Sequence, residues 1–294
     1  MQPKLQHINA LTSSSITVRR DVIPYMDQPL HYHTEYEIVY IEKSYGVRLI
    51  GNHIGNFSDG DLMFISPNLP HVWKNDRFFY ENQHNHKAIV YVINFREDAL
   101  TEQFFDLPEF TQVKKIFILG KQGILFNNNK EKAKISKLVK QVYHSTGIKR
   151  LTLFFNTLEA LTQAKDYILL SGPGYASSTN GTETDRINKV ITYLMENYSR
   201  EINLDEISSF TNLNKSSFCR FFKARTKKTY TQFLNEIRIV HACKLLTNGT
   251  MKISEVCYET GYNNISHFNR QFKLFTGSTA KEYSKKYRIN ASPF

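Results

Sequence analysis

Phe218-Cys-Arg-Phe-Phe-Lys223 and Phe268-Asn-Arg-Gln-Phe-Lys273, which lie 50 residues apart, share the pattern Phe-x-Arg-x-Phe-Lys. On a helix, which advances about 100° per residue, the two phenylalanines of each copy share one face, and the Arg and Lys project from the opposite face. A short helix and a turn precede each copy, so a complete helix-turn-helix unit is repeated. A solvated polar face would explain one such helix. The repetition favours two matched surfaces for a polyanion.

The rest of the C-terminal part also shows helical spacing. The expected helices cover 186–198 after a cap at Asp185, 204–210 after a capping box of Asn203 and Glu206, 215–225, 231–247, 253–260 and a last helix from Asn264. Turns are expected at 211–214 and at Gly261. The helix over 231–247 is about 25 Å long, which suits two helices held about one DNA turn of 34 Å apart.

The positive charge of the chain is concentrated in the same part. The chain has 294 residues and a net charge of +11. Residues 182–294 contain 18 Lys and Arg against 10 Asp and Glu, whereas residues 1–181 contain 20 against 17. A basic excess beside repeated helices is typical of nucleic-acid binding. A chain of this length with 41% hydrophobic residues is expected to fold into two domains and not to be disordered.

The N-terminal part has a different periodicity. From about residue 16 to 120, short apolar runs are separated by Gly, Pro and Asn, which predicts a β-sandwich or barrel. Its clearest strands are 37–41, 46–50, 62–65 and 88–95, and helices are expected over 131–144 and 150–169. A stretch rich in Gly, Ser and Thr, 171–184, is expected to be a linker. The fold class is therefore α+β, with an all-α domain over 185–294.

The chain shows neither a run of about 18 apolar residues nor a secretory signal at its start, so we expect a cytoplasmic protein without membrane segments. Its three cysteines, Cys219, Cys243 and Cys257, lack metal-finger spacing and are interpreted as thiols. Cys219 is interpreted as a small residue that faces DNA, with a redox sensor as the alternative.

The C-terminal part resembles the AraC family of bacterial transcription regulators over about residues 185–288. The family signature, close to G-[FY]-x-x-x-S-x-F-x-R-x-F-K-x-x-x-G-x-x-P, is matched by Gly261-Tyr-Asn-Asn-Ile-Ser-His-Phe-Asn-Arg-Gln-Phe-Lys273 and by Gly277. The chain departs from it at Ala280, where the family has Pro. In the first unit, Lys227 and Tyr230 stand where the family often has Gly and Pro. These departures put the local geometry of the turns in question more than DNA binding.

The resemblance implies that the outward residues of each copy reach base edges in the major groove. These residues are Ser216, Ser217, Cys219 and Arg220 in the first copy and Ile265, Ser266, Asn269 and Arg270 in the second. Arg can bind guanine and Asn can bind adenine through paired hydrogen bonds. A phosphate or an intramolecular carboxylate is the alternative partner of the two arginines. Lys215, Lys223 and Lys273 are expected to contact phosphates.

The N-terminal part resembles the cupin-like sensor domain that many family members carry. The similarity lies in His31-Tyr-His-Thr-Glu-Tyr-Glu37 and in the run from Gly60 to His71. It implies an effector-sensing barrel over 1–120 and a helical dimerisation or packing segment over 121–170. The expected effector pocket consists of His31, His33, Tyr36, Glu37, Tyr40, Arg48, His71 and Trp73.

Four of these residues, His31, His33, Glu37 and His71, also match the positions that hold a metal in enzymatic cupins. Imidazole and carboxylate ligands suit Zn, Fe, Mn or Ni. In this family such residues commonly line an effector pocket without a metal, so we expect no metal and no other cofactor.

We therefore predict a ligand-responsive, sequence-specific DNA-binding transcription regulator, an activator that is not an enzyme. Its expected partners are double-stranded promoter DNA, a small-molecule effector, RNA polymerase and a second copy of the chain in a homodimer. Two alternatives stay open. One is a metal-dependent cupin oxygenase or isomerase with a helical appendage. The other is a non-specific architectural protein, whose affinity for DNA would fall with salt for every sequence alike.

Overall fold

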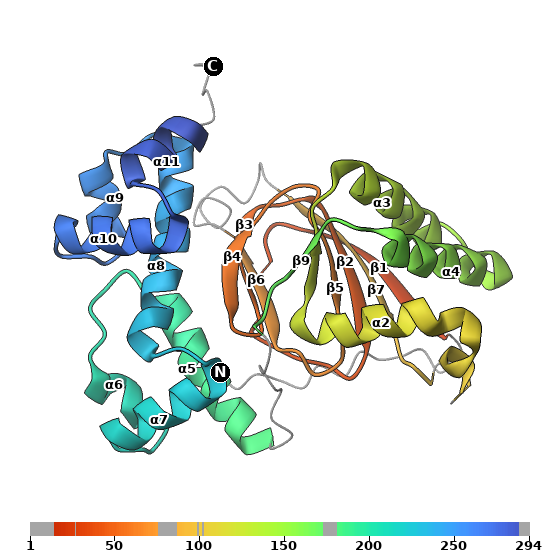
Figure 1. Ribbon diagram of the computed structural model, residues 1–294, viewed down its shortest axis with the longest axis horizontal. Helices are drawn as coiled ribbons and strands as arrows, with labels where there is room; N and C mark the ends of the chain where they lie inside the picture. Colours follow the sequence, from red (N-terminus) through yellow and green to blue (C-terminus); the bar gives the residue numbers. More distant parts are fainter. Residues whose placement is uncertain are drawn as a thin grey trace. The chain divides into compact units, whose positions relative to one another are not determined.

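A computed structural model of the protein describes residues 15–26, 28–75, 87–98, 100–101, 103–172 and 181–287, with the side chains after 181 described from Arg186 onward. The chain forms two compact units, which consist in the main of the residues before and after position 177. Figure 1 shows the first unit in red to green and the second in cyan to blue. Within the described residues, the helices are too short or too polar to span a membrane.

Two β-sheets form the first unit, and the predicted α+β class is confirmed. The six-stranded sheet is antiparallel and runs in the order β1 (Ile16–Ile23), β7 (Ala88–Phe95), β2 (Tyr36–Lys43), β5 (Leu62–Ile65), β8 (Ile124–Phe126) and β9 (Tyr167–Leu169). The three-stranded sheet runs in the order β4 (His53–Phe57), β3 (Gly46–Ile50) and β6 (His71–Asn75). The four strands expected most clearly are present as β2, β3, β5 and β7.

Each face of the six-stranded sheet has its own apolar core, because side chains alternate along a strand. On β2, Ile38 belongs to the core under the helices, whereas Val39 belongs to the core that also contains Trp73 of the three-stranded sheet. The helices that pack on the outer face are α2 (Thr111–Leu119), α3 (Asn129–Tyr143) and α4 (Gly147–Gln163). Short 3₁₀ turns precede or follow α2: η1 (Phe104–Asp106), η2 (Pro108–Phe110) and η3 (Gly120–Gln122).

The segment from 121 to 170 differs from the expected purely helical one. The helix predicted over 150–169 ends at Gln163 as α4, and Tyr167–Leu169 instead forms β9, which pairs with β8. The start of the expected linker also contacts the sheets, since Ser171 is buried and its hydroxyl donates to the carbonyl of Ile50 at 2.9 Å. Residues 181–184 already belong to the next helix. Residues 173–180 lie outside the described part of the chain.

Seven helices and the turns between them make up residues 181–287, the described C-terminal part of the second unit. They are α5 (Gly181–Asn197), α6 (Leu204–Ser209), α7 (Lys215–Thr226), α8 (Tyr230–Asn248), α9 (Ile253–Glu259), α10 (Ile265–Thr276) and α11 (Ala280–Tyr287). Because α5 begins at Gly181, Asp185 is not its cap, contrary to expectation. Asn203 does cap α6, by accepting the backbone N–H of Glu206 at 2.7 Å. The carboxylate of Glu206 instead pairs with Arg200, and α11 was not expected.

The long helix α8 contributes to the cores of both helix-turn-helix units. Near its start, the ring of Phe233 packs against that of Phe222 on α7, with centroids 5.6 Å apart. Further along, α8 supplies Ile239, Ala242, Cys243 and Leu246 to a core that contains Phe268 and Phe272 of α10. All four phenylalanines of the repeated pattern are fully buried, namely Phe218, Phe222, Phe268 and Phe272. The two units therefore share one structural element.

Candidate functional site

Helices α7 and α10 present the polar faces that the repeated pattern predicts. Most of the expected base-reading residues are exposed, and only Ser217 is half-buried: Ser216, Ser217, Cys219, Arg220, Ile265, Ser266, Asn269 and Arg270. Among the described carboxylates, neither Arg220 nor Arg270 has an ion-pair partner, which argues against the alternative of an intramolecular carboxylate. Within the described residues, the guanidinium of Arg220 donates one hydrogen bond, to the hydroxyl of Ser217 at 3.4 Å.

The residues expected to contact phosphates also lie on the surface. Lys223 and Lys273 are exposed on the last turns of α7 and α10. Lys215 is exposed at the start of α7, but its ammonium lies 2.8 Å from the carboxylate of Asp205. A phosphate contact by Lys215 would therefore compete with this exposed ion pair.

Matching caps begin both of these helices. The side chain of Asn214 accepts the N–H of Ser217 at 2.9 Å, and that of Asn264 accepts the N–H of His267 at 2.9 Å. After each helix, Lys227 and Gly277 adopt left-handed backbone conformations. Tyr230 and Ala280, which replace prolines of the family signature, are the first residues of α8 and α11. Pro is favoured at this position because its missing N–H would have no helical partner.

Threonine caps stabilise the starts of α8 and α11, where Tyr230 and Ala280 replace the prolines of the family signature. Thr229 accepts the N–H of Gln232, and Thr279 accepts the N–H of Glu282, each at 3.2 Å. The Gln and Glu side chains accept the threonine N–H in return, which makes two capping boxes. The spacing Thr-x-x-Gln and Thr-x-x-Glu could have revealed both boxes from sequence.

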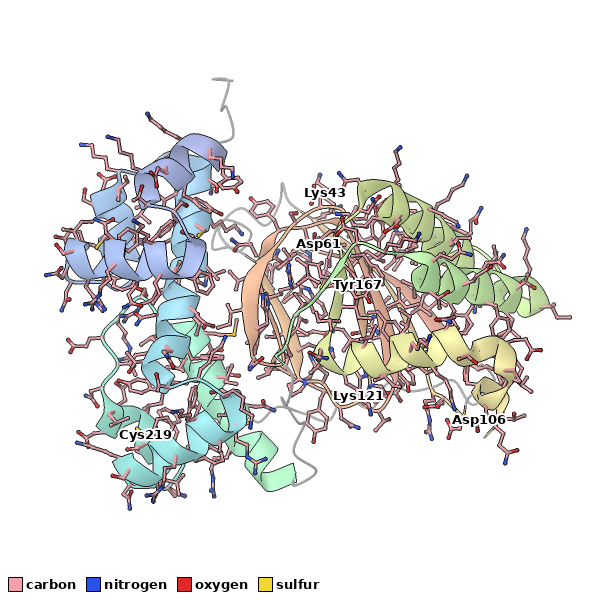
Figure 2. All side chains as sticks on the ribbon, in the orientation of Figure 1. Lys43, Asp61, Asp106, Lys121, Tyr167 and Cys219 are labelled. Atoms are coloured by element: carbon pink, nitrogen blue, oxygen red, sulfur yellow. The ribbon has the colours of Figure 1, made fainter. Side chains whose placement is uncertain are left out.

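The three cysteines are free thiols, as expected. Cys219 is exposed on α7 (Figure 2), whereas Cys243 and Cys257 are buried. Burial raises the pKa of Cys243 to about 11, which keeps this thiol protonated near neutral pH.

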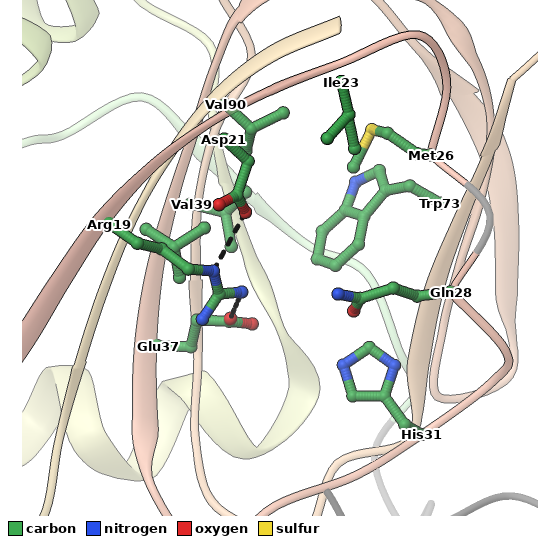
Figure 3. A pocket seen from close by; sticks show the side chains of 11 residues that line it. Arg19, Asp21, Ile23, Met26, Gln28, His31, Glu37, Val39, Trp73 and Val90 are labelled. Carbon is green, nitrogen blue, oxygen red and sulfur yellow. Dashed lines mark hydrogen bonds and ion pairs between the residues drawn. The ribbon is translucent and has the colours of Figure 1, made fainter. Parts of the chain in front are cut away.

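The first unit contains a pocket between the inner face of the six-stranded sheet and β6. Figure 3 shows Arg19 between Asp21 and Glu37, opposite Trp73, Gln28 and His31. Eleven residues line the pocket: Arg19, Asp21, Ile23, Met26, Gln28, His31, Glu37, Val39, Trp73, Val90 and Val92. Three of the eight predicted pocket residues, His31, Glu37 and Trp73, are among them. His33 and His71 lie directly behind, in contact with Glu37.

Three predicted pocket residues lie elsewhere. Tyr36 and Tyr40 project from the opposite face of β2, where they pack against the core under α2, α3 and α4. Arg48 is buried on β3, and its guanidinium lies 3.1 Å from the carboxylate of Asp61. Sequence reasoning missed Arg19 and Asp21, which come from β1. The available signal for this strand was the spacing of Ile16, Val18 and Val22 at even positions, with polar residues at 17, 19 and 21, although Arg20 interrupts it.

His31, His33 and His71 form a buried cluster whose ligand nitrogens all lie within 4.8 Å of one another. The side chain of Glu37 joins them. Its Oε2 is 3.2 Å from Nε2 of His71 and 3.5 Å from Nε2 of His33, although none of these three atoms has a hydrogen bond of good geometry. On the other side, Oε1 of Glu37 is 3.7 Å from the Arg19 guanidinium.

The surroundings determine the charges in this cluster. Burial would raise the pKa of Glu37, but its contacts with His33 and His71 hold that pKa well below its usual value, so the carboxylate is ionised. Burial would lower the pKa of His33, yet the contact with Glu37 and the charge of Glu35 raise it. Burial and the neighbouring His71 lower the pKa of His31 to about 3, so this imidazole is neutral near pH 7.

Comparison with protein families matches residues 207–286 to a helix-turn-helix domain. The chain is 23% identical over 278 residues to the uncharacterized HTH-type transcriptional regulator YdeC of Bacillus subtilis, covering 92% of this chain and 89% of that protein. It is 21% identical over 252 residues to the HTH-type transcriptional activator RhaS of Shigella dysenteriae, covering 85% of each. The chain spans only 29% of the length of a further set of matching regulators from Staphylococcus aureus.

Among solved structures, ToxT from Vibrio cholerae is similar over 93% of this chain, with 14% identity and a TM-score of 0.37. A probable AraC family transcriptional regulator from Rhodopseudomonas palustris covers 35% of the chain, with 21% identity and a TM-score of 0.34.

Proposed function

We propose that this protein, a DNA-binding transcription regulator with an AraC-type double helix-turn-helix domain, reads promoter DNA through α7 and α10 and responds to a small ligand held in its first unit. One observation carries the proposal. Two helices of one compact unit expose matched faces with Arg220 and Arg270, and their phenylalanine anchors pack against the same helix α8. Helices of this kind dock in successive major grooves.

The exposed side chains differ between the two faces, and this difference supports direct reading of a sequence without inverted symmetry. The face of α7 offers Ser216 and Arg220, whereas that of α10 offers Ile265, Asn269 and Arg270. Arg suits guanine, Asn suits adenine, and an apolar group such as Ile suits the methyl of thymine. Each chain would therefore read two different short sequences, one in each groove.

Selection of bound sequences from a random DNA pool tests the proposal. The wild-type chain is expected to enrich one motif, and replacement of Arg220 and Arg270 by Ala should remove the preference at about one base pair in each half, at a cost of about 1–3 kcal/mol per contact. Lys137→Ala is a matched control, because it removes an exposed positive charge from α3. Unchanged discrimination in the double variant would support the architectural alternative, which binds every sequence alike.

The pocket of the first unit is the proposed effector site. It combines the apolar side chains of Val39, Val90 and Val92 with the polar groups of Arg19 and His31, as small-molecule sites commonly do. A ligand there changes DNA binding only if it binds the active and inactive states with different affinity. Trp73 is the only tryptophan of the chain and lines the pocket, so its fluorescence reports occupancy directly.

Activation, contact with RNA polymerase, a homodimer and a cytoplasmic location complete the proposal. Activation is supported by the name of the RhaS relative, a transcriptional activator. Transcription of a promoter that carries the selected motif, measured with purified RNA polymerase, should rise when the protein is added. A fall in transcript would identify a repressor instead.

A further inference from the structure

The three histidines of the first unit are brought together by backbone pairing. The N–H of His71 donates to the carbonyl of His31 at 2.9 Å, and the N–H of His31 donates back at 3.2 Å. The ring centroids of His31 and His71 are 4.4 Å apart, and those of His33 and His71 are 5.0 Å apart. All three residues are at most 5% exposed. The imidazoles therefore converge in a place from which solvent is largely excluded.

Backbone carbonyls fix the same tautomer in all three rings. The Nδ1 atoms of His31, His33 and His71 lie 2.9, 3.0 and 2.7 Å from the carbonyl oxygens of Pro29, Glu35 and Leu69. A carbonyl oxygen only accepts, so each Nδ1 carries the hydrogen, and in a neutral ring Nε2 carries the lone pair. Metal-binding histidines are typically held by such a hydrogen bond from the other ring nitrogen.

In the cluster, the lone pairs of the Glu37 carboxylate face those of two imidazole nitrogens. Its Oε2 points at the Nε2 atoms of His33 and His71, and the three buried atoms lack hydrogen-bond partners in the described part of the chain. Asp21 and Glu35 add negative charge nearby, whereas Arg19 is the cation in contact with Glu37. Such an arrangement is stable when a positive ion or a proton sits between these atoms, because each of them then acts as a donor to it.

Contrary to the expectation from the sequence that no metal is bound, we propose that His31, His33 and His71, together with Glu37, bind one divalent first-row transition-metal ion, with Arg19 as the residue that positions Glu37. Three nitrogens and one carboxylate oxygen suit Zn, Fe, Co or Ni, whereas Mg and Ca prefer sites made of oxygens. The inference deepens the proposed function, because it makes a metal ion one ligand of the sensing pocket. Metal binding itself does not depend on the proposed function, but an effect of the metal on DNA binding does.

Arg19 holds the carboxylate from the side away from the imidazoles. Its guanidinium lies 3.7 Å from Oε1 of Glu37, 3.1 Å from the side-chain oxygen of Asn94 and 2.9 Å from the carboxylate of Asp21. One carboxylate oxygen is thus engaged by Arg19, and the other is turned to the imidazoles. Partners of this kind commonly change metal affinity by about 10–100-fold when they are removed.

The test uses the purified full chain, stripped with a chelator and titrated with Co²⁺ and with Zn²⁺. Wild type is expected to bind one ion per chain, with ligand-field absorption for Co²⁺. Co²⁺ should also quench the fluorescence of Trp73, whose ring centroid is 5.4 Å from that of His71. His71→Ala should lose stoichiometric binding and quenching. Arg19→Met should weaken Co²⁺ binding by about 10-fold or more, with the same stoichiometry and absorption.

Two further variants keep the result interpretable. His144→Ala removes an exposed histidine outside the cluster and should titrate like wild type. Glu37→Gln keeps the size of the side chain but removes its charge, and it should weaken binding if His71→Ala does not fold. The proposal is overturned if wild type binds neither ion at one per chain, or if both His71→Ala and Glu37→Gln bind like wild type. DNA binding by α7 and α10 is measured separately, so either proposal can fail alone.

Discussion

Lys227 and Gly277 occupy the same place in the two helix-turn-helix units, directly after α7 and α10, and both have a left-handed backbone, with φ of 62° and 75°. The N–H of each donates to a carbonyl one turn back, Lys223 or Lys273, at 2.9 Å. Glycine adopts this conformation without the steric cost that a side chain imposes. The first helix-turn-helix unit therefore has the same turn as the second, although Lys227 is less suited to this conformation than glycine.

Replacement of Lys227 by Gly should stabilise the helical unit that contains both helix-turn-helix motifs. Relief of the left-handed strain is worth about 1–2 kcal/mol, offset in part by the greater freedom of glycine in the unfolded chain, so a net gain of about 0.5–1 kcal/mol is expected. Gly277→Lys should lower the free energy of unfolding by a similar amount. Urea denaturation of both variants checks this pair, and a shift of the same sign in both would contradict the strain argument.

The asparagine caps allow stability and DNA binding to be separated. Asn214→Ala and Asn264→Ala should each cost about 1 kcal/mol, because the capped N–H groups of Ser217 and His267 lose their acceptor. Asn264→Asp should retain the stability, since Asp caps equally well. It should nevertheless weaken DNA binding, because it puts a negative charge at the start of α10. Thermal unfolding and DNA titration are measured on the same samples, and parallel loss of both in the Asp variant would contradict this separation.

Phe268 and Phe275 lie on the same helix but differ in burial, being 0% and 43% exposed. Phe268→Ala should cost about 3–5 kcal/mol, because it opens a cavity in the core beside α8. Phe275→Ala, the matched control, should cost less than about 1 kcal/mol. Equal losses in denaturant unfolding would show that the core does not depend on the repeated phenylalanine.

A side chain at position 261 should disrupt the turn of the second helix-turn-helix unit. Gly261 has φ of 82°, and an added Cβ would lie 2.5 Å from the carbonyl oxygen of Tyr198. Gly261→Ala is expected to lower the free energy of unfolding by about 1–3 kcal/mol, through backbone strain and this close contact. Gly172→Ala is a suitable control, since an added Cβ there meets nothing within 4 Å. Thermal stability equal to that of wild type in both variants would rule out the steric argument.

Lys273→Ala distinguishes a phosphate contact from base reading. Loss of one phosphate contact should weaken binding about equally for all sequences and reduce the dependence of log K on log salt concentration by about 0.9. Titrations of matched and scrambled DNA at several salt concentrations provide the measurement. A loss confined to the matched sequence would assign Lys273 to a base instead.

The structure of the C-terminal helical unit could be predicted from the sequence more completely than that of the N-terminal β-sheet unit. Helix α7 begins at Lys215 as expected, because its apolar positions face one core and its exposed positions are polar. Both faces of β2 are buried, so its residues give no alternation from which to tell inward from outward positions. For this reason the sequence does not reveal that Tyr36 and Tyr40, expected in the pocket, belong to the opposite core.

Other differences arise from contacts between distant segments. Tyr167–Leu169 reads as the end of a helix, but pairing with Ile124–Phe126 stabilises it as a strand. Arg19 reaches the pocket only because β1 pairs with β7 at the edge of the six-stranded sheet. The histidines could be selected from their residue type and motif. Their tautomers depend on backbone carbonyls whose positions no local pattern reveals.

Helix α8 limits which sequence changes this protein can tolerate during evolution. Its 19 residues serve two cores, so the angle between the two exposed faces depends on its length. Insertion of a single residue would rotate one face by about 100° and move it by about 1.5 Å, so the two helices would no longer fit one duplex. If α7 and α10 read DNA as proposed, new target sequences can arise by substitutions on these two helices, whereas insertions and deletions within α8 should be eliminated by selection.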